Sequence, residues 1–306
     1  MSTAPTVEAR AVCKRYGRHE AVRGVDLTLH PGECVALVGH NGAGKSSLIK
    51  LMLGLTHPTG GSLHVLGQDP AGPQAARIRR QVGFLPENVA FHPGMTGLEC
   101  LDFYARLKGL PTAGNRDLLE RVGLGREAAG KRIGTYSKGM RQRLGLSQAL
   151  LGAPRLLFLD EPTTGLDPAL RQSFYAIVRE LRDGGATVLL CSHALTELEG
   201  QADRVVVMNR GRKVAEGCLA TLRQLADLPV RLRVRPVDGT QAGTLCALYG
   251  IPAQDGPVVA LSCSGADKLP LLRHLLESGI PLEDLEVVQP SLDDIYAHFL
   301  AREDAA

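Results

Sequence analysis

The sequence predicts an α/β fold with a parallel core sheet, and two patterns lead to this prediction. Apolar runs recur along the chain: 34–38 and 156–159 are uninterrupted, and 187–191 and 204–208 each continue as four apolar residues after one polar residue. Such runs are typical of parallel strands covered on both faces, and apolar residues at helical spacing between them support this arrangement. Residues 22–30 alternate apolar and polar side chains instead, which predicts an antiparallel strand beside the parallel sheet.

A helical insert and a smaller second domain complete the predicted architecture. From about 92 to 152, apolar residues recur at three-to-four spacing without a convincing strand, so we expect a helical subdomain there. The composition changes after Leu219, where valine or leucine alternates with arginine over 230–235. We therefore expect a large domain over 1–222 and a small C-terminal α/β domain over 223–306.

Composition narrows the classes of function. The 306 residues include 44% hydrophobic and 22% charged ones, with a net charge of +3, so no nucleic-acid partner is expected. No apolar run approaches the roughly 18 residues of a membrane span, and charges in the first sixteen residues argue against a signal peptide. Seven scattered cysteines without a C-x-x-C pair favour reduced thiols over a disulfide framework or a zinc site.

One glycine-rich segment has the composition of a phosphate-binding loop. It fits G-x-x-x-x-G-K-[ST] and consists of Gly39, His40, Asn41, Gly42, Ala43, Gly44, Lys45 and Ser46. The preceding strand and following helix supply the context that this motif requires. The glycines let backbone N–H groups converge on phosphate, Lys45 would reach the β and γ phosphates, and the Ser46 hydroxyl would ligate Mg²⁺.

Two carboxylates follow a buried strand-like run and supply the acidic partner of this loop. The run 156–159 ends in Asp160 and Glu161. Asp160 is expected to hold Mg²⁺, and Glu161, one residue on, to polarise a water that attacks the γ-phosphate.

Residues 136–140 offer a second anion site or simply a capped helix. Ser137 is a natural N-cap, and Gly139 would let a phosphate approach closely. The residues alone leave both interpretations open.

The order of these motifs resembles that of the nucleotide-binding subunits of ABC transporters. That family has an A-loop aromatic residue, a Walker A loop, a signature motif, a Walker B strand with a catalytic glutamate, a D-loop and a switch histidine. The matching positions are Tyr16, residues 39–46, residues 136–140, residues 156–160 with Glu161, Asp167 and His193. The resemblance covers residues 1–220 and implies a P-loop NTPase of the ABC type that uses ATP and Mg²⁺.

The resemblance also implies roles for these residues and a dimer. Tyr16 would stack on adenine, Ser47 would join the loop in binding ATP, and His193 would sense the γ-phosphate. Two copies would form a head-to-tail homodimer around two ATP molecules. In it, one copy would present its signature motif to the ATP of the other, through Ser137, Lys138, Gly139 and Met140.

Two positions depart from the family pattern. Glu87 stands where a glutamine is usual; it can still ligate Mg²⁺ or water but adds a negative charge. Lys138 and Tyr136 replace the commoner glycine and leucine of the signature motif, while Ser137 and Gly139 remain. Activity is expected, and its rate is left open.

Narrower resemblances suggest which transporter the chain serves. Residues 289–296 look like the ending of ATPases of the ABC-2 exporter branch. Residues 39–42, 85–93 and 135–151 look like the ATPase subunits of the Nos copper-maturation transporter, which supports nitrous oxide reductase assembly. This resemblance implies delivery of copper or a sulfur species, an integral membrane permease, a periplasmic copper-system protein and a peripheral location on the cytoplasmic side of the inner membrane.

Other functions stay open at this point. A drug, lipid or polysaccharide exporter competes with the copper system, and a soluble ABC ATPase without a permease is a further alternative. The C-terminal domain could sense a ligand, although a docking or dimer-supporting role is favoured because no convergent polar site is evident there.

Overall fold

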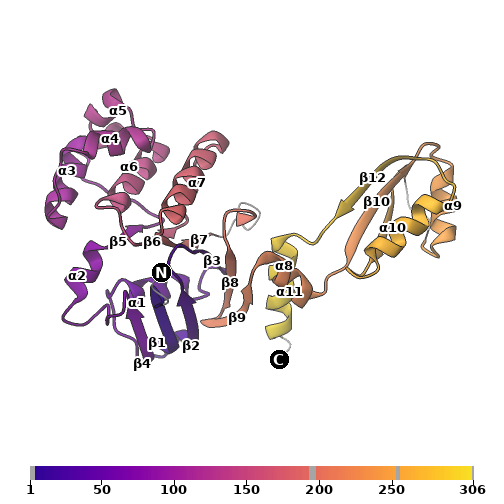
Figure 1. The fold of residues 1–306 in the computed structure, drawn as a ribbon, viewed down its shortest axis with the longest axis horizontal. Helices are drawn as coiled ribbons and strands as arrows, with labels where there is room; N and C mark the ends of the chain where they lie inside the picture. Colours follow the sequence, from indigo (N-terminus) through magenta and orange to yellow (C-terminus); the bar gives the residue numbers. More distant parts are fainter. Residues whose placement is uncertain (1–3, 193–197, 253–255, 305–306) are drawn as a thin grey trace. The chain divides into compact units, whose positions relative to one another are not determined.

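The computed structural model describes residues 4–192, 198–252 and 256–304 (Figure 1). The chain divides into two compact units, Met1–Glu216 and Gly217–Ala306, which are described separately here.

The first unit is built on a six-stranded sheet. Its strands are β3 (Cys34–Val38), β5 (Val82–Leu85), β6 (Leu156–Asp160), β7 (Thr187–Cys191), β8 (Arg204–Asn209) and β9 (Arg212–Gly217). They lie in the order β5-β6-β7-β3-β8-β9, and the strands from β5 to β8 run parallel. Strands β3 and β7 are buried along their whole length, as their apolar runs predict. Because β3, β6 and β7 are neighbours, the loops after these three strands meet at one edge of the sheet.

A second, antiparallel sheet packs against the same core. Strands β1 (Val7–Tyr16), β2 (His19–Leu29) and β4 (Gly60–Val65) form it in the order β2-β1-β4. Helix α1 (Lys45–Met52) contacts β2 and β4 and shares one hydrophobic cluster with both sheets. Two further helices of this unit are α2 (Ala75–Arg80) and α7 (Pro168–Asp183).

The predicted helical insert is present. It contains α3 (Gly97–Lys108), α4 (Asn115–Arg121), α5 (Arg126–Gly130), a 3-10 turn (Ile133–Thr135) and α6 (Lys138–Leu150). These helices gather on one side of the core sheet, with α7 beside α6 (Figure 1). Residues 92–152 contain no strand, only an isolated bridge between Thr96 and Arg132.

The second unit is a small α/β module. It consists of α8 (Leu219–Ala226), β10 (Val230–Pro236), α9 (Gln241–Leu248), β11 (Val259–Cys263), α10 (Lys268–Glu277), β12 (Leu282–Val288) and α11 (Leu292–Asp304). The strands form an antiparallel sheet in the order β11-β10-β12, and buried residues of α9 and α10 join its hydrophobic cluster. Helix α8 contacts α11, so this unit begins at Gly217, whereas the composition of the sequence suggests a boundary at 223.

Candidate functional site: an ATP-binding site

The glycine-rich loop lies between the end of β3 and the start of α1. Gly44 precedes α1 with a φ of 104°, and a Cβ at this position would lie 2.4 Å from the carbonyl oxygen of Ala21. Only glycine fits this backbone, which brings the N-terminus of α1 close to β2. The first N–H groups of α1 have no side-chain cap and face the loop, where a phosphate can accept their hydrogen bonds.

Lys45 is held underneath this loop. Its side chain is buried, and its Nζ donates hydrogen bonds to the carbonyl oxygens of Gly39 and His40, the latter at 3.3 Å. The ammonium group therefore lies at the centre of the loop, in the place from which a lysine contacts bound phosphate.

Tyr16 and the glycine-rich loop line one cavity of about 190 Å³. Its lining comprises Tyr16, His19, Ala21 and residues 40–47. Tyr16 ends β1 with its ring partly exposed and with the Nζ of Lys14 5.0 Å from the ring centroid. An aromatic face beside a phosphate-binding loop suits a purine nucleotide, with the base on the ring and the phosphates at the loop.

His19 is a residue of this cavity that sequence reasoning missed. It pairs with Tyr16 across the β1–β2 hairpin, which turns through Gly17 and Arg18. The signal was available, because a two-residue turn with glycine places the flanking residues opposite each other.

Asp160 and Glu161 lie at the carboxyl end of β6, as the sequence predicts. Glu161 is 9% exposed and has a φ of +49°, unusual for a residue with a side chain. Its N–H donates to the carbonyl of Cys191 at 2.9 Å, which ties this strained residue to the end of β7. Strained backbone of this kind concentrates at functional sites, where the surrounding structure enforces it.

Burial raises the pKa of Asp160, and the neighbouring charge of Glu161 raises it further. Lys45 and a hydrogen bond with Ser46 oppose the shift, while the charge of Glu87 adds to it. The loop, the carboxylates and Glu87 thus act on one another electrostatically. A hydroxyl and several carboxylates are all oxygen donors, the set that Mg²⁺ prefers, and a divalent cation would offset their repulsion.

The signature-like residues lie outside the cavity that the glycine-rich loop lines. Ser137 is exposed and caps α6 by accepting a hydrogen bond from the Met140 N–H at 3.2 Å. Tyr136 is buried, and its hydroxyl donates to the carbonyl of Ala128 at 2.6 Å. None of residues 136–140 lines the cavity around the glycine-rich loop, so one described chain does not bring the two motifs into the same cavity.

The last two predicted site residues are Asp167 and His193, and the structure describes only the first of them. Asp167 caps α7, because its Oδ1 accepts a hydrogen bond from the N–H of Leu170 at 2.9 Å. His193 lies outside the described residues.

The described residues contain neither a membrane-spanning helix nor a metal-binding cluster of the usual kind. Within residues 4–192, 198–252 and 256–304, no helix has the length and apolarity needed to span a bilayer. Over the same ranges, no group of three or more histidines, cysteines or carboxylates is arranged to hold a metal by itself.

A phosphate-binding loop after a buried parallel strand, with two carboxylates at the end of a nearby strand, defines a P-loop nucleotide hydrolase. A family described as "ABC transporter" matches residues 22–164. The ABC transporter ATP-binding protein YxlF of Bacillus subtilis, itself uncharacterized, is 38% identical over 295 residues, which cover 94% of this chain and 96% of YxlF.

Two further relatives have more specific names. The daunorubicin/doxorubicin resistance ATP-binding protein DrrA of Streptomyces peucetius is 35% identical, over 97% of this chain and 93% of its own. The Nod factor export ATP-binding protein I of Burkholderia thailandensis is 41% identical, over 72% and 73% respectively.

Solved structures show the same fold. An ATP-binding subunit of an ABC transporter superposes with a TM-score of 0.67 and 32% identity, over 72% of this chain and 92% of that one. The dimeric cassette MJ0796, at 23% identity, matches in fold with a TM-score of 0.65 over 70% and 98%. The chain belongs to the ATP-binding proteins of ABC transporters, and it is an ATPase. The predicted fold class is confirmed.

The comparisons support the expected ABC transporter ATPase but not the expected copper-maturation system. Two of the three relatives described above are named for drug resistance and Nod factor export, YxlF is uncharacterized, and none of the three names refers to copper or to nitrous oxide reductase.

Proposed function

We propose that this chain is the motor subunit of an ABC exporter, working as a head-to-tail pair with a second copy. The observation that carries the proposal is the separation of two half-sites. The glycine-rich loop, Tyr16 and Lys45 line one cavity, while Ser137 is exposed at the start of α6 and does not line that cavity. A second copy facing the first would bring its Ser137 and the helix N-terminus behind it to the γ-phosphate.

Within one half-site, each residue has a distinct task. Tyr16 stacks on adenine, the backbone of residues 39–47 holds the phosphates, and Lys45 leaves its carbonyl partners to contact the β and γ phosphates. Ser46 and Asp160 would hold Mg²⁺, and Glu87, whose charge acts on Asp160, would contribute directly or through water. The metal would supply positive charge that offsets the negative charge of the phosphates. Glu161 orients the attacking water and accepts its proton, and His193 senses the γ-phosphate.

The second copy completes the site by charge stabilisation. The N-terminus of α6 carries a partial positive charge, and Ser137, Lys138, Gly139 and Met140 present donors that can face the γ-phosphate. The α6 helix has no acidic residue in its first turn to oppose this. Asp167 fixes the D-loop beside it by capping α7.

A permease would dock on the outer surface of α3. Phe103 is half exposed and Leu107 is 71% exposed, and both are on α3. The ring of Tyr104 packs edge-to-face against Phe103 and against Phe91, which lies a few residues after Glu87. Exposed apolar side chains next to a segment that starts at a proposed Mg²⁺ ligand suit a partner whose conformation must respond to hydrolysis. We therefore place the chain at the cytoplasmic side of the inner membrane, bound through its permease.

For the cargo, an exported organic molecule is the first candidate. DrrA, which matches 97% of this chain, is named for daunorubicin/doxorubicin resistance, and the relative that matches 72% of it is named for Nod factor export. Copper-centre assembly is the second candidate, because residues 39–42 and 85–93 resemble the Nos ATPases, and it would add a periplasmic copper-system protein to the complex.

Affinity purification from detergent-solubilised membranes of the native host tests this proposal. We expect a polytopic permease to accompany the tagged chain. A periplasmic copper-system protein in the same complex would select the copper function, and its absence would select the exporter. Recovery of ribosomal or DNA-repair proteins in place of any permease would overturn the transporter proposal.

The nucleotide site has its own test in Lys45→Ala. Loss of the ammonium should weaken ATP binding itself, measured by equilibrium dialysis with labelled ATP, while Lys50→Ala on the exposed face of α1 serves as the matched control. Unchanged ATP affinity in Lys45→Ala would contradict the phosphate role.

A further inference from the structure

A buried hydrogen bond joins α6 to the segment that follows Glu161. Gln142 lies in the second turn of α6 and is 5% exposed. Its Nε2 donates to the carbonyl oxygen of Pro162 at 3.0 Å, one residue after Glu161. The helix that begins at Ser137 is therefore tied directly to the backbone of the catalytic segment of the same chain.

The first turn of α6 also rests on the D-loop. The stem of Lys138 lies over Gly165, where a Cβ would come within 3.2 Å of three side-chain atoms of this lysine. Gly139 faces Leu166 and Leu170, with a Cβ at its position in ordinary contact with both. These neighbours of Gly165 and Gly139 are a lysine stem and leucine side chains, and such contacts fix a direction less sharply than a hydrogen bond does.

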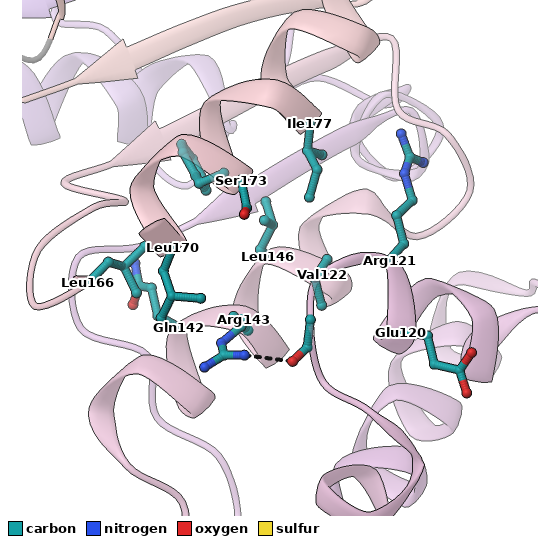
Figure 2. A pocket seen from close by; sticks show the side chains of 12 residues that line it. Glu120, Arg121, Val122, Gln142, Arg143, Leu146, Leu166, Leu170, Ser173 and Ile177 are labelled. Atoms are coloured by element: carbon teal, nitrogen blue, oxygen red, sulfur yellow. Dashed lines mark hydrogen bonds between the residues drawn. The ribbon is translucent and has the colours of Figure 1, made fainter. Parts of the chain in front are cut away.

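A cavity of about 150 Å³ separates the rest of α6 from α7 (Figure 2). Gln142, Leu146, Leu166 and Leu170 point into it, and Ile177 lies across from Leu146 (Figure 2). Side chains that border an empty space lack partner atoms on that side, so dispersion forces hold α6 to α7 less firmly than in a close-packed core. The position of α6 relative to Glu161 then depends strongly on the hydrogen bond of Gln142.

We propose that Gln142 is a positioning residue that couples the two ATP sites of the dimer. This rests on the proposed function, in which Glu161 acts on the ATP of its own chain and Ser137 acts on the ATP of the partner. A shift of the 161–162 backbone during hydrolysis at one site moves α6 through Gln142 and displaces Ser137 at the other site. The rate of hydrolysis at each ATP site thereby depends on whether ATP has been hydrolysed at the other site.

The test uses the purified full-length chain and its steady-state MgATP hydrolysis. In Gln142→Met the side chain keeps its approximate volume and loses the donor. We expect kcat to fall about tenfold, the scale of one lost buried hydrogen bond. The Hill coefficient for ATP should fall from above one toward one, while KM changes by less than about twofold because no residue of the ATP cavity is altered.

Two companion variants separate coupling from general destabilisation. Leu146→Ala enlarges the same cavity and lowers thermal stability but leaves the hydrogen bond intact, so it should retain cooperativity. Gln142→Glu carries an acceptor when ionised and regains a donor when protonated, and burial favours the protonated form. Its kcat relative to the original chain at each pH should therefore rise as the pH falls from about 7.5 to about 6.

The outcomes are distinguishable. Unchanged kcat and cooperativity in Gln142→Met, or equal losses of cooperativity in Leu146→Ala, would overturn the coupling role. MgATP-driven dimerisation of Glu161→Gln is measured alongside. If that dimer forms, a negative result with Gln142→Met refutes only the coupling role of Gln142. If the dimer does not form, the head-to-tail arrangement itself is wrong.

Discussion

At the scale of single residues, Asp160 sits in an environment that disfavours its own charge. Burial and Glu161 raise its pKa, and Glu87 acts in the same direction. The unfolded chain ionises this carboxyl at its ordinary pKa, whereas the folded chain keeps it protonated to higher pH. The contribution of Asp160 to the stability of the metal-free protein therefore falls as pH rises between these two values, and stays low above the raised pKa.

Asp160→Asn should remove the destabilisation that the ionised Asp160 causes in the metal-free protein. We expect the metal-free variant to have a higher Tm than the original chain at neutral pH and to gain less from added Mg²⁺, because a ligand and a repelling charge are both removed. Differential scanning calorimetry with and without Mg²⁺, at about pH 4 and about pH 8, measures both effects. A lower Tm for Asp160→Asn at the higher pH would contradict this account of the carboxylate cluster.

The seven cysteines differ in burial and in pKa, and these differences predict which thiol reacts first. Burial raises the pKa of Cys34 to about 12 and that of Cys191 well above its usual value, so both thiols are protonated and inaccessible. Cys218 is exposed at the start of α8, and its hydrogen bond with the Thr221 hydroxyl lowers its pKa. We expect a maleimide at neutral pH to label Cys218 first among the described cysteines.

Peptide mass mapping identifies the thiol that is modified first. Cys218→Ser should remove the fast phase of labelling, and Cys263→Ser, which removes a partly buried thiol of raised pKa, is the matched control. Early modification of Cys34 or Cys191 would mean that the core sheet opens in the native state.

Individual site residues were predictable where a motif fixes them. Lys45, Asp160 and Glu161 follow from local sequence, since a loop and a strand end specify each one. Gln142 was not predictable, because its partner is the carbonyl of Pro162, twenty residues away in the chain, and an apolar helix face gives no sign of such a bond. The positive φ of Glu161 likewise depends on its hydrogen bond to β7.

At the scale of elements, α3 begins with a capping box. The Thr96 side chain accepts from the N–H of Glu99 at 3.2 Å, and Glu99 accepts from the N–H of Thr96 at 2.8 Å. The backbone of Thr96 also forms an isolated β-bridge with Arg132, so the cap joins two parts of the helical insert.

Thr96→Ala should lower the free energy of unfolding by about 1 kcal/mol, the usual cost of losing an N-cap. Urea unfolding followed by circular dichroism measures the change, and Thr96→Ser, which keeps the hydroxyl, is the control. ATP affinity should not change, because neither Thr96 nor Glu99 lines the ATP cavity. Equal stability of the alanine and serine variants would show that the cap does not stabilise α3.

Prediction of elements succeeded where periodicity was regular. The apolar runs of β3 and β7 coincide with the observed strands. Strand β1 was missed because irregular pairing after Ala9 and the positive φ of Ala11 break its alternation. Helix α9 was missed because Gly243 and Thr244 weaken its helical signal, and its stability comes from burying Leu245 and Cys246 in the core of the second unit.

At the scale of the whole molecule, each unit has its own hydrophobic core, and the residues predicted to bind and hydrolyse ATP belong to the first. The second unit leaves Arg231, Arg233 and Arg235 exposed on its central strand, opposite the face that packs against its helices. That this unit supports docking or dimerisation, and not ligand sensing, stays a prediction.

The central claim is that two chains close around ATP with Glu161 as the catalytic base. Glu161→Gln should still bind ATP and lose at least about a hundredfold in turnover. Light scattering on a sizing column should show this variant as a dimer with MgATP and as a monomer without nucleotide. The double variant with Lys45→Ala should stay monomeric. A Glu161→Gln chain that remains a monomer in MgATP and hydrolyses ATP at the original rate would contradict both the role of Glu161 and the closed dimer.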